Sequence, residues 1–222
     1  MRFRFFTIVL LLVACKKETI FQVQIIGHAG NGLTIQSSIY VPNSKEAIEL
    51  ALGTIGVDGV EIDLQLSKDN ELWLFHDDTM DKETNSSGCI AEKSFDELKS
   101  VRFKTANQEK LVRLKDLNFQ LYKGKTLYLD MRHYNGCNYD LLEKELLQEA
   151  LVEAIDQWKN DVTFILVLNY SDWLNYFSSN GWNTYTDVHD MDDFHSLIES
   201  NTSFNGVVIR NSIANQETVQ II

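Results

Sequence analysis

The sequence predicts a single α/β domain built as a β/α barrel. Short apolar runs that have the length of strands alternate along the chain with amphipathic helix patterns, which is typical of a parallel sheet covered by helices. Several of these runs are continuously apolar, as expected for strands buried on both faces. The residues that follow the runs are polar, and barrels place their working residues at the carboxyl ends of their strands.

The composition fits one domain and argues against some classes of ligand. The chain has 222 residues, of which 44% are hydrophobic, and this is enough for one core. Its formal net charge of −12 argues against a nucleic acid as the main ligand. Residues 27–32 contain glycines but lack the GxGxxG pattern and open no helix, so a dinucleotide-binding fold is not favoured.

The first 22 residues are expected to lie outside the folded domain. A short basic segment is followed by an apolar run of ten residues that ends in Leu-Val-Ala-Cys at Cys15. The run is too short to span a bilayer and has the length of a signal-peptide core. Its ending resembles the lipobox of bacterial lipoproteins, in which the cysteine is lipidated. An ordinary secretory signal and a chance apolar start are the alternatives. We therefore expect a signal peptide over 1–14, a lipidated tether over 15–22, a domain over 23–222, and attachment to a membrane of the bacterial cell envelope.

The first half of the domain begins with a strand and a helix. The strand is predicted over 23–26. The helix is expected to begin after Asn43, because Glu46 follows this capping residue by three positions, and to run to Gly53. Strands over 60–64 and 71–75 and a mostly helical stretch over 92–121 are predicted next.

The second half shows the alternation of strands and helices more clearly. It has a strand pattern, a long amphipathic helix and a fully apolar strand, followed by shorter elements of the same two kinds. The predicted ranges are 126–131 for the strand, 141–158 for the helix, 162–168 for the apolar strand, 172–178 for a helix, 182–186 for a weak strand, 191–199 for a helix and 206–210 for a last strand.

Three acidic side chains are expected to meet at one edge of the sheet. Glu61 and Asp63 are two residues apart in a strand, so both point to the same face. Asp130 and Arg132 share a face of another strand in the same way. Buried acids are costly unless a positive charge lies between them, and three carboxylates suit Ca²⁺ or Mg²⁺ more than zinc. A salt-bridged pair at the barrel mouth is the alternative for Glu61 and Asp63.

Two histidines follow other predicted strands. His28 comes after the first strand, and His76 comes after the strand over 71–75. Two imidazoles can divide general-base and general-acid work near neutral pH, and a metal ion beside them can offset the charge of a phosphoryl group. Each histidine alone would more often be a hydrogen-bonded structural residue, and their combination with the carboxylates favours a catalytic site.

These residues resemble the motifs of the glycerophosphodiester phosphodiesterase family, which shares its barrel type with phosphatidylinositol-specific phospholipases C. The resemblance extends from about residue 25 to 132. The family's His-Arg-Gly, Pro-Glu-Asn-Thr, Glu-x-Asp, His-Asp and Glu-x-Lys motifs are matched, in part, by His28-Ala29-Gly30, Pro42-Asn43-Ser44, Glu61-Ile62-Asp63, His76-Asp77 and Asp130-Met131-Arg132.

The resemblance implies a TIM-type (β/α) barrel of the phospholipase-C-like phosphodiesterases and metal-dependent hydrolysis of a small phosphodiester to an alcohol and a phosphomonoester. It implies that His28 and His76 are the acid/base pair. The residues that it assigns to one divalent cation, Ca²⁺ or Mg²⁺, are Glu61, Asp63 and Asp130, and those that we assign to the substrate are Arg132, Arg210 and Asn43.

Two departures from the family pattern keep other functions open. Ala29 stands where the family has an arginine that contacts phosphate, and Pro42 stands where it has a glutamate. We expect Arg132 or Arg210 to supply the missing charge. The family's C-terminal motifs have no match after Arg210, so we expect a trimmed barrel or a truncated form of a longer chain. The alternatives are a lipoprotein that binds a phosphate ester without turnover, and a phosphodiesterase of another branch of the same barrel.

Two further groups of residues carry ligand-type side chains. Cys89 and Cys137 both lie in loops that follow predicted strands, and a disulfide and two separate thiols fit an exported protein equally. Residues 187–195 are rich in aspartate and histidine. A solvated turn with acids at a helix start is favoured there over a second metal site.

Overall fold

The computed structural model describes residues 24–32 and 38–209. Four of the predictions lie outside these residues. They concern the signal peptide over 1–14, the tether over 15–22, the lipidated Cys15 and the substrate contact of Arg210.

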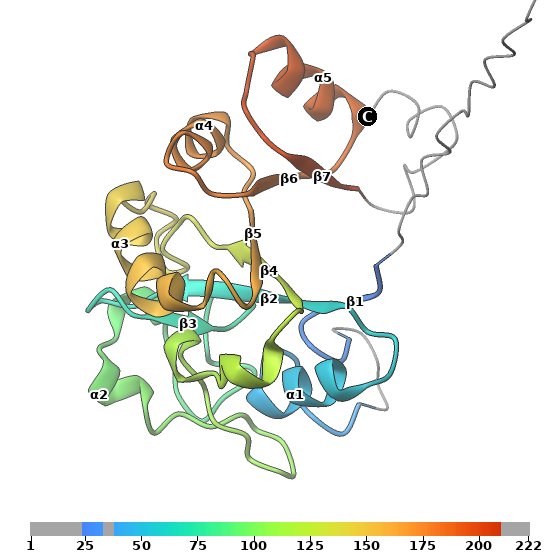
Figure 1. Ribbon diagram of the computed structural model, residues 1–222. Helices are drawn as coiled ribbons and strands as arrows, with labels where there is room; N and C mark the ends of the chain where they lie inside the picture. The colour runs from blue at the N-terminus through green and yellow to red at the C-terminus, as the bar shows by residue number, and fades with distance from the viewer. Residues whose placement is uncertain (1–23, 33–37, 210–222) are drawn as a thin grey trace, which may run out of the picture.

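The described residues form an α/β fold around one curled sheet (Figure 1). The strands lie in the order β1-β2-β4-β5-β6-β7, and neighbours on this path run parallel. A short strand, β3, pairs with β2 in the antiparallel direction. The strands are β1 (Ile26–Gly27), β2 (Gly59–Leu66), β3 (Leu72–Leu74), β4 (Thr126–Met131), β5 (Thr163–Val167), β6 (Thr184–Val188) and β7 (Gly206–Ile209).

The longer helices cover the outer side of the curved sheet, as Figure 1 shows. Helix α1 contacts β1 and β2, α3 contacts β3 and α4, and both α4 and α5 contact β6. The α-helices are α1 (Lys45–Gly53), α2 (Phe95–Leu98), α3 (Lys144–Ile155), α4 (Ser171–Ser179) and α5 (Met191–Glu199). Short 3₁₀ turns are formed by η1 (Ile90–Glu92), η2 (Leu114–Asp116), η3 (Phe119–Tyr122) and η4 (Asp156–Trp158).

This arrangement confirms the predicted fold class as an open half of a β/α barrel. Within residues 24–32 and 38–209, β1 and β7 are the two edges of the sheet, and the concave face between them is hollow. Strand β2 is buried along nearly its whole length, from Gly59 to Leu66. Side chains that point outward from β2, such as Ile62 and Leu64, pack in the main core under the helices. Those that point inward are free to build a site.

The direction of β3 differs from the all-parallel sheet that the sequence predicts. Residues 67–71 form a tight connection between β2 and β3. Such a short connection allows only a hairpin, because a parallel crossover needs a dozen or more residues. Leu74 therefore lies opposite Leu64, and the chain returns along β2 toward the residues that carry its acids.

The prediction of a mostly helical stretch over 92–121 was wrong. Only α2 and three short 3₁₀ turns form there, and residues between them make isolated antiparallel bridges such as Thr84↔Phe103. Val101, Phe103 and Leu111 pack with Trp73 in a second core cluster. Extended backbone lets these side chains reach that cluster, so tertiary packing overrides a weak helix propensity.

The predicted cap of the first helix was off by one residue. Ser44 is the capping residue of α1, because its hydroxyl accepts a hydrogen bond from the Ala47 N–H at 3.1 Å. Asn43 precedes it with a positive φ of 61°. Asparagine tolerates this left-handed conformation better than most residues, and its side chain is thereby released for another contact.

Cys89 and Cys137 form a disulfide, with their Cα atoms 5.5 Å apart. The sequence left this pairing open. The bond joins the loop after β3 to the loop after β4. Asp78 reinforces the connection by accepting hydrogen bonds from the hydroxyls of Tyr134 at 3.1 Å and Tyr139 at 2.9 Å. The two loops that border the hollow face are therefore held together.

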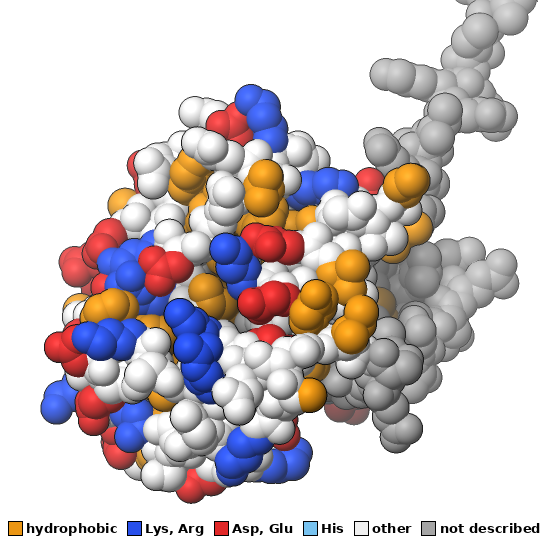
Figure 2. All heavy atoms as spheres, turned by 90° about the horizontal axis from the view of Figure 1, so that it is seen from below, with side chains coloured by type: hydrophobic (Ala, Val, Ile, Leu, Met, Phe, Trp, Pro, Cys, Tyr) orange, Lys and Arg blue, Asp and Glu red, His pale blue; other side chains and the backbone are white. Residues whose placement is uncertain are grey.

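The outer surface mixes charges of both signs. On the described part of the face in Figure 2, Lys and Arg side chains are interspersed with Asp and Glu and form no continuous basic area. Within the described part of the chain, no helix combines the length and the apolar character that a bilayer crossing requires.

Candidate active site

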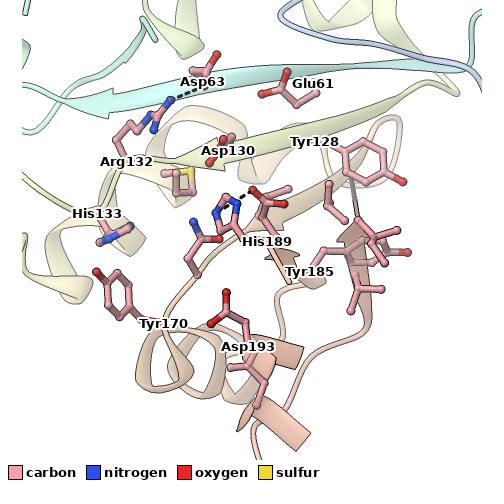
Figure 3. Close-up of a pocket in the computed structure, with 18 of the residues that line it drawn as sticks. Glu61, Asp63, Tyr128, Asp130, Arg132, His133, Tyr170, Tyr185, His189 and Asp193 are labelled. Atoms are coloured by element: carbon pink, nitrogen blue, oxygen red, sulfur yellow. Dashed lines mark hydrogen bonds and ion pairs between the residues drawn. The ribbon is translucent and has the colours of Figure 1, made fainter. Parts of the chain in front are cut away.

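The concave face of the sheet encloses a cavity of about 1690 Å³. Side chains from β1, β2, β4, β6 and α5 line it, together with residues of the connecting loops. Figure 3 shows Glu61, Asp63, Asp130 and Arg132 on one side of this cavity and Tyr185, His189 and Asp193 on the opposite side. Of the site residues that the sequence singled out, six therefore line one open space: His28, Glu61, Asp63, His76, Asp130 and Arg132.

Three carboxylates are brought together by the pairing of β2 with β4. Asp63 lies directly opposite Asp130 in the parallel register, and Glu61 lies two residues before Asp63 on the same face. One carboxylate oxygen from each of the three side chains lies within 4.8 Å of the others. This spacing and the all-oxygen donor set fit a hard divalent cation such as Ca²⁺ or Mg²⁺.

The ionisation of these acids reflects their crowding. Burial, together with the charge of Asp63, raises the pKa of the Glu61 carboxyl well above its ordinary value. Burial, followed by the charge of Asp63, raises the pKa of Asp130 to about 6. Like charges close together in a partly dry site disfavour ionisation. A bound cation would remove this penalty, so the electrostatics also fit the donor set.

Arg132 brings positive charge to the rim of this cluster. Its Nη2 atom lies 3.2 Å from the Asp63 Oδ1 atom. Burial alone would lower the pKa of the guanidinium, but the charges of Asp130 and Asp63 raise it. The Nε atom of Arg132 is buried and has no hydrogen-bond partner among the described residues. Its side chain lines the cavity, so the guanidinium can meet an anion there.

Two neighbours hold the acids of β2 in place. The backbone N–H of Ala29 donates to the Glu61 Oε2 atom at 2.8 Å. The Asn43 amide donates to the Asp63 Oδ2 atom at 2.8 Å, and its oxygen accepts the Asp63 N–H at 3.0 Å. Asn43 is 2% exposed. Its side chain is therefore engaged with Asp63, and the structure does not place it in the cavity as the substrate contact that the sequence suggested.

His28 lies in the turn after β1, at the edge of the cavity. Its side chain is 62% exposed, and its Nε2 atom lies 3.7 Å from the Glu61 Oε2 atom. Ala29, the next residue, is fully buried with a φ of 49°. This left-handed turn directs the Ala29 N–H at Glu61, but the methyl side chain of Ala29 can offer no charge to a phosphate.

His76 reaches the cavity because β3 runs antiparallel to β2. The hairpin brings the residues after Leu74 back to the middle of β2, where the Phe75 N–H donates to the Asp63 carbonyl at 3.1 Å. The His76 Nδ1 atom lies 2.8 Å from the Asp77 Oδ1 atom. A carboxylate at Nδ1 orients the ring and leaves Nε2 available to a ligand. Asp77 was missed as a partner, although its place next to His76 was the available signal.

The cavity is also lined by residues that the sequence assigned to no site. Tyr128 of β4 and Tyr185 of β6 meet edge to face, with ring centroids 5.8 Å apart. His133 is 8% exposed and packs against Tyr170, with ring centroids 4.4 Å apart. Burial lowers the pKa of His133. The alternation of side chains along β4 and β6 could have indicated that the two tyrosines face the cavity. The position of His133 depends on the loop that follows β4, which has no such alternation.

Residues 187–195 hold a helix start, as the sequence favoured. Asp190 caps α5 by accepting the Asp193 N–H at 2.9 Å. His189 Nε2 lies 3.6 Å from Asp187 Oδ2. No residue of this segment belongs to a group of three ligand-type side chains that is close enough to hold a metal ion, among the residues that the structure describes.

Comparison with known proteins points to one family of phosphodiesterases. A model described as the glycerophosphoryl diester phosphodiesterase family matches residues 36–193. A glycerophosphodiester phosphodiesterase from Caldanaerobacter subterraneus is 34% identical over 77 residues, which are 35% of this chain and 29% of the relative. One from Bacillus altitudinis is 40% identical over 60 residues, which are 27% of this chain and 24% of the relative. The chain thus spans less than a third of the length of these two relatives.

Solved structures share the fold. A glycerophosphoryl diester phosphodiesterase from Agrobacterium tumefaciens, described in its own report as putative, superposes with a TM-score of 0.71 at 16% identity, covering 90% of this chain and 82% of the other. A phosphodiesterase from Oleispira antarctica, solved with the product sn-glycerol-3-phosphate, gives a TM-score of 0.71 at 23% identity and covers 90% and 79%. The family model matches well over half of the residues of this chain, and the chain therefore belongs to the glycerophosphoryl diester phosphodiesterase family.

Proposed function

We propose that the protein hydrolyses a small phosphodiester of the glycerophosphodiester type, giving an alcohol and a phosphomonoester. One observation carries the proposal. A single cavity brings together three carboxylates, two imidazoles and a guanidinium, which come from separate elements of the fold. Membership of the family, and the activity in the names of its relatives, support the same chemistry.

Glu61, Asp63 and Asp130 would hold one divalent cation, Ca²⁺ or Mg²⁺. When bound, such a cation offsets the negative charge of a phosphodiester and polarises a phosphoryl oxygen. The chain's own contribution is to keep the three carboxylates in place. The Ala29 N–H restrains Glu61, and the Asn43 amide restrains Asp63.

His28 and His76 would move the protons. In hydrolysis of the diester, the oxygen of a water molecule forms a bond to phosphorus and one P–O ester bond breaks, so that the water loses a proton and the departing alcohol gains one. One neutral imidazole can accept the first proton while the other, protonated, donates the second. The two rings approach the cavity from different elements, the turn after β1 and the residues after β3. Asp77 would stabilise the protonated form of His76 through their 2.8 Å contact.

Arg132 would bind a phosphate oxygen and so take over the task of the arginine that Ala29 replaces. Its guanidinium already lies beside Asp63, at the edge of the carboxylate cluster. A guanidinium can give a phosphate two parallel hydrogen bonds, which a lysine ammonium cannot. Arg210 is the second candidate for this charge, and it lies outside the described residues.

The test is release of phosphomonoester from glycerophosphocholine and related diesters in the presence of Ca²⁺ or Mg²⁺. Wild type should turn over at least one diester, and His28→Ala and His76→Ala should each remove most of that activity. His195→Ala, on the exposed side of α5, serves as the matched control and should retain it. If wild type releases no more product than the His28→Ala, His76→Ala double variant, the enzymatic proposal is wrong.

A binding measurement beside the turnover assay separates a binding protein from an enzyme. Ala29 stands where the family has an arginine that contacts phosphate, so this chain lacks that contact. The second candidate is therefore a protein that binds a phosphate ester without cleaving it. Isothermal titration of wild type with a diester and with its phosphomonoester product would detect such binding. Tight binding without turnover on any tested diester would support this second candidate.

Lipid attachment at Cys15 is the remaining part of the proposal. The basic start, the ten-residue apolar run and the Leu-Val-Ala-Cys ending support it. Growth of a bacterial host with a labelled fatty acid should label the wild-type chain and place it in the membrane fraction of the cell envelope. Cys15→Ser should lose both properties, and a wild-type chain without label would exclude the anchor.

A further inference from the structure

Gln65 is a buried amide next to the cluster of acids. It lies on β2, two residues beyond Asp63, so period-two alternation places Glu61, Asp63 and Gln65 on one face of the strand. Gln65 is 6% exposed. A buried amide is stable only when its polar atoms are hydrogen-bonded, so its partners indicate what it does.

The partners of Gln65 lie on either side of His76. The Nε2 atom donates to the Phe75 carbonyl at 3.0 Å and to the Asp77 carbonyl at 2.8 Å. An amide nitrogen carries two hydrogens, so one group can satisfy both acceptors. The two carbonyls belong to the residues immediately before and after His76, and the histidine backbone is therefore held at both ends.

This contact replaces a strand pairing that has ended. The ladder between β2 and β3 stops at Leu74, two residues before His76. Beyond this point, the Phe75 N–H still donates to the Asp63 carbonyl, and Gln65 continues the link from β2 to Asp77. The His76 side chain is 41% exposed, so surrounding side chains enclose it only in part, and its direction depends on the backbone and on Asp77.

We propose that Gln65 is a positioning residue that fixes the His76–Asp77 pair over the site by hydrogen-bonding the carbonyls on both sides of His76. The inference rests on the proposed function, in which His76 transfers a proton. A positioned acid or base loses rate steeply when it moves, because a displacement of about 1 Å can cost roughly 100-fold.

The first test is Gln65→Met, which keeps the length of the side chain and removes both donors. We expect the kcat for diester hydrolysis to fall about 10- to 100-fold. The KM, and the Kd for Ca²⁺ measured by calorimetry, should stay within about twofold of wild type, because Arg132 and the three carboxylates are unchanged. Gln148→Met makes the same chemical change on α3, away from the cavity, and should leave all three values unchanged.

A double-mutant cycle with His76→Ala separates positioning from general destabilisation. If Gln65 acts through His76, Gln65→Met should lower kcat in the wild-type background and have no further effect in the His76→Ala background. Equal losses in both backgrounds, or no loss in either, would overturn the inference. Gln65→Glu, which offers no donor when ionised, replaces Gln65→Met in the cycle if the methionine variant does not fold.

Failure of the positioning role and failure of the proposed function give different results. A wild-type protein whose turnover requires His76 but is indifferent to Gln65 would overturn the positioning role and leave the proposed function standing. A wild-type protein with no turnover above His76→Ala would overturn both.

Discussion

Replacement of Asp130 by asparagine should stabilise the protein when no divalent cation is present. Asp130 has a pKa of about 6 in the folded protein, against an ordinary value of 3.8. The folded state therefore binds this proton more tightly than the unfolded state, and the free energy of unfolding falls as pH rises from about 4 to above 6. The opposing effect of Arg132 is already contained in this pKa.

The magnitude follows from the size of the shift. A rise of roughly 2 pKa units corresponds to about 3 kcal/mol of stability lost above pH 6. Asp130→Asn removes the ionisation and should recover up to this amount at pH 7.5. For a chain of this length the gain corresponds to roughly 6 to 12 °C in Tm. At pH 4, where the carboxyl is protonated in the folded protein, the variant and wild type should have nearly equal Tm values.

Thermal unfolding in EDTA at pH 4 and pH 7.5 measures the effect, followed by the same scans with Ca²⁺ or Mg²⁺. Added cation should raise the Tm of wild type at pH 7.5 and raise that of Asp130→Asn much less, because a ligand of the cation is missing. Asp156→Asn removes an exposed charge near the end of α3 and controls for net charge. If Asp130→Asn is no more stable than wild type at pH 7.5, or gains as much at pH 4, the electrostatic account of the site is wrong.

Other contacts of the cavity and its loops carry three more predictions. Arg132→Met should raise the KM for a diester about 10-fold or more, since a charged hydrogen bond is worth roughly 1.5 to 3 kcal/mol. Arg132→Lys should recover part of this loss. An unchanged KM of Arg132→Met in steady-state kinetics would contradict phosphate binding by Arg132. Replacing Cys89 and Cys137 by serine should lower the free energy of unfolding by about 4 kcal/mol in urea titrations, because the bond spans 48 residues; a loss below about 1 kcal/mol would refute that estimate. Burial and the charge of Asp63 are the main causes of the raised pKa of Asp130, and the charge of Asp187 adds to them. Asp187→Asn should therefore lower the pH at which the Tm falls in EDTA, and an unchanged midpoint of that fall would contradict this contribution.

Local patterns in the sequence were enough to predict which acids could share a face. Glu61 and Asp63 alternate with Ile62 and Leu64, and the structure places the two kinds of side chain on opposite faces of β2. The fold class was also predictable, because alternating strands and helices constrain the sheet to be mainly parallel. These inferences depend on backbone periodicity, which is a local property.

Contacts between distant segments were beyond the reach of the sequence. The pairing of Asp63 with Asp130, 67 positions apart in the sequence (130 − 63), depends on the register between β2 and β4. The disulfide between Cys89 and Cys137 depends on the approach of two loops, which Gly136 makes possible. A Cβ atom on Gly136 would lie 2.2 Å from the Asp78 carbonyl oxygen.

The sequence by itself determined the type of fold, the chemical character of the site and the family that its motifs resemble. Only the tertiary structure decided how His76 reaches the acids, that Asn43 serves Asp63, and that Gln65 holds the residues around His76. The physical reason is the reversal of β3. A five-residue connection turns the chain back along β2, and the Gln65 side chain on β2 then satisfies the backbone carbonyls of Phe75 and Asp77.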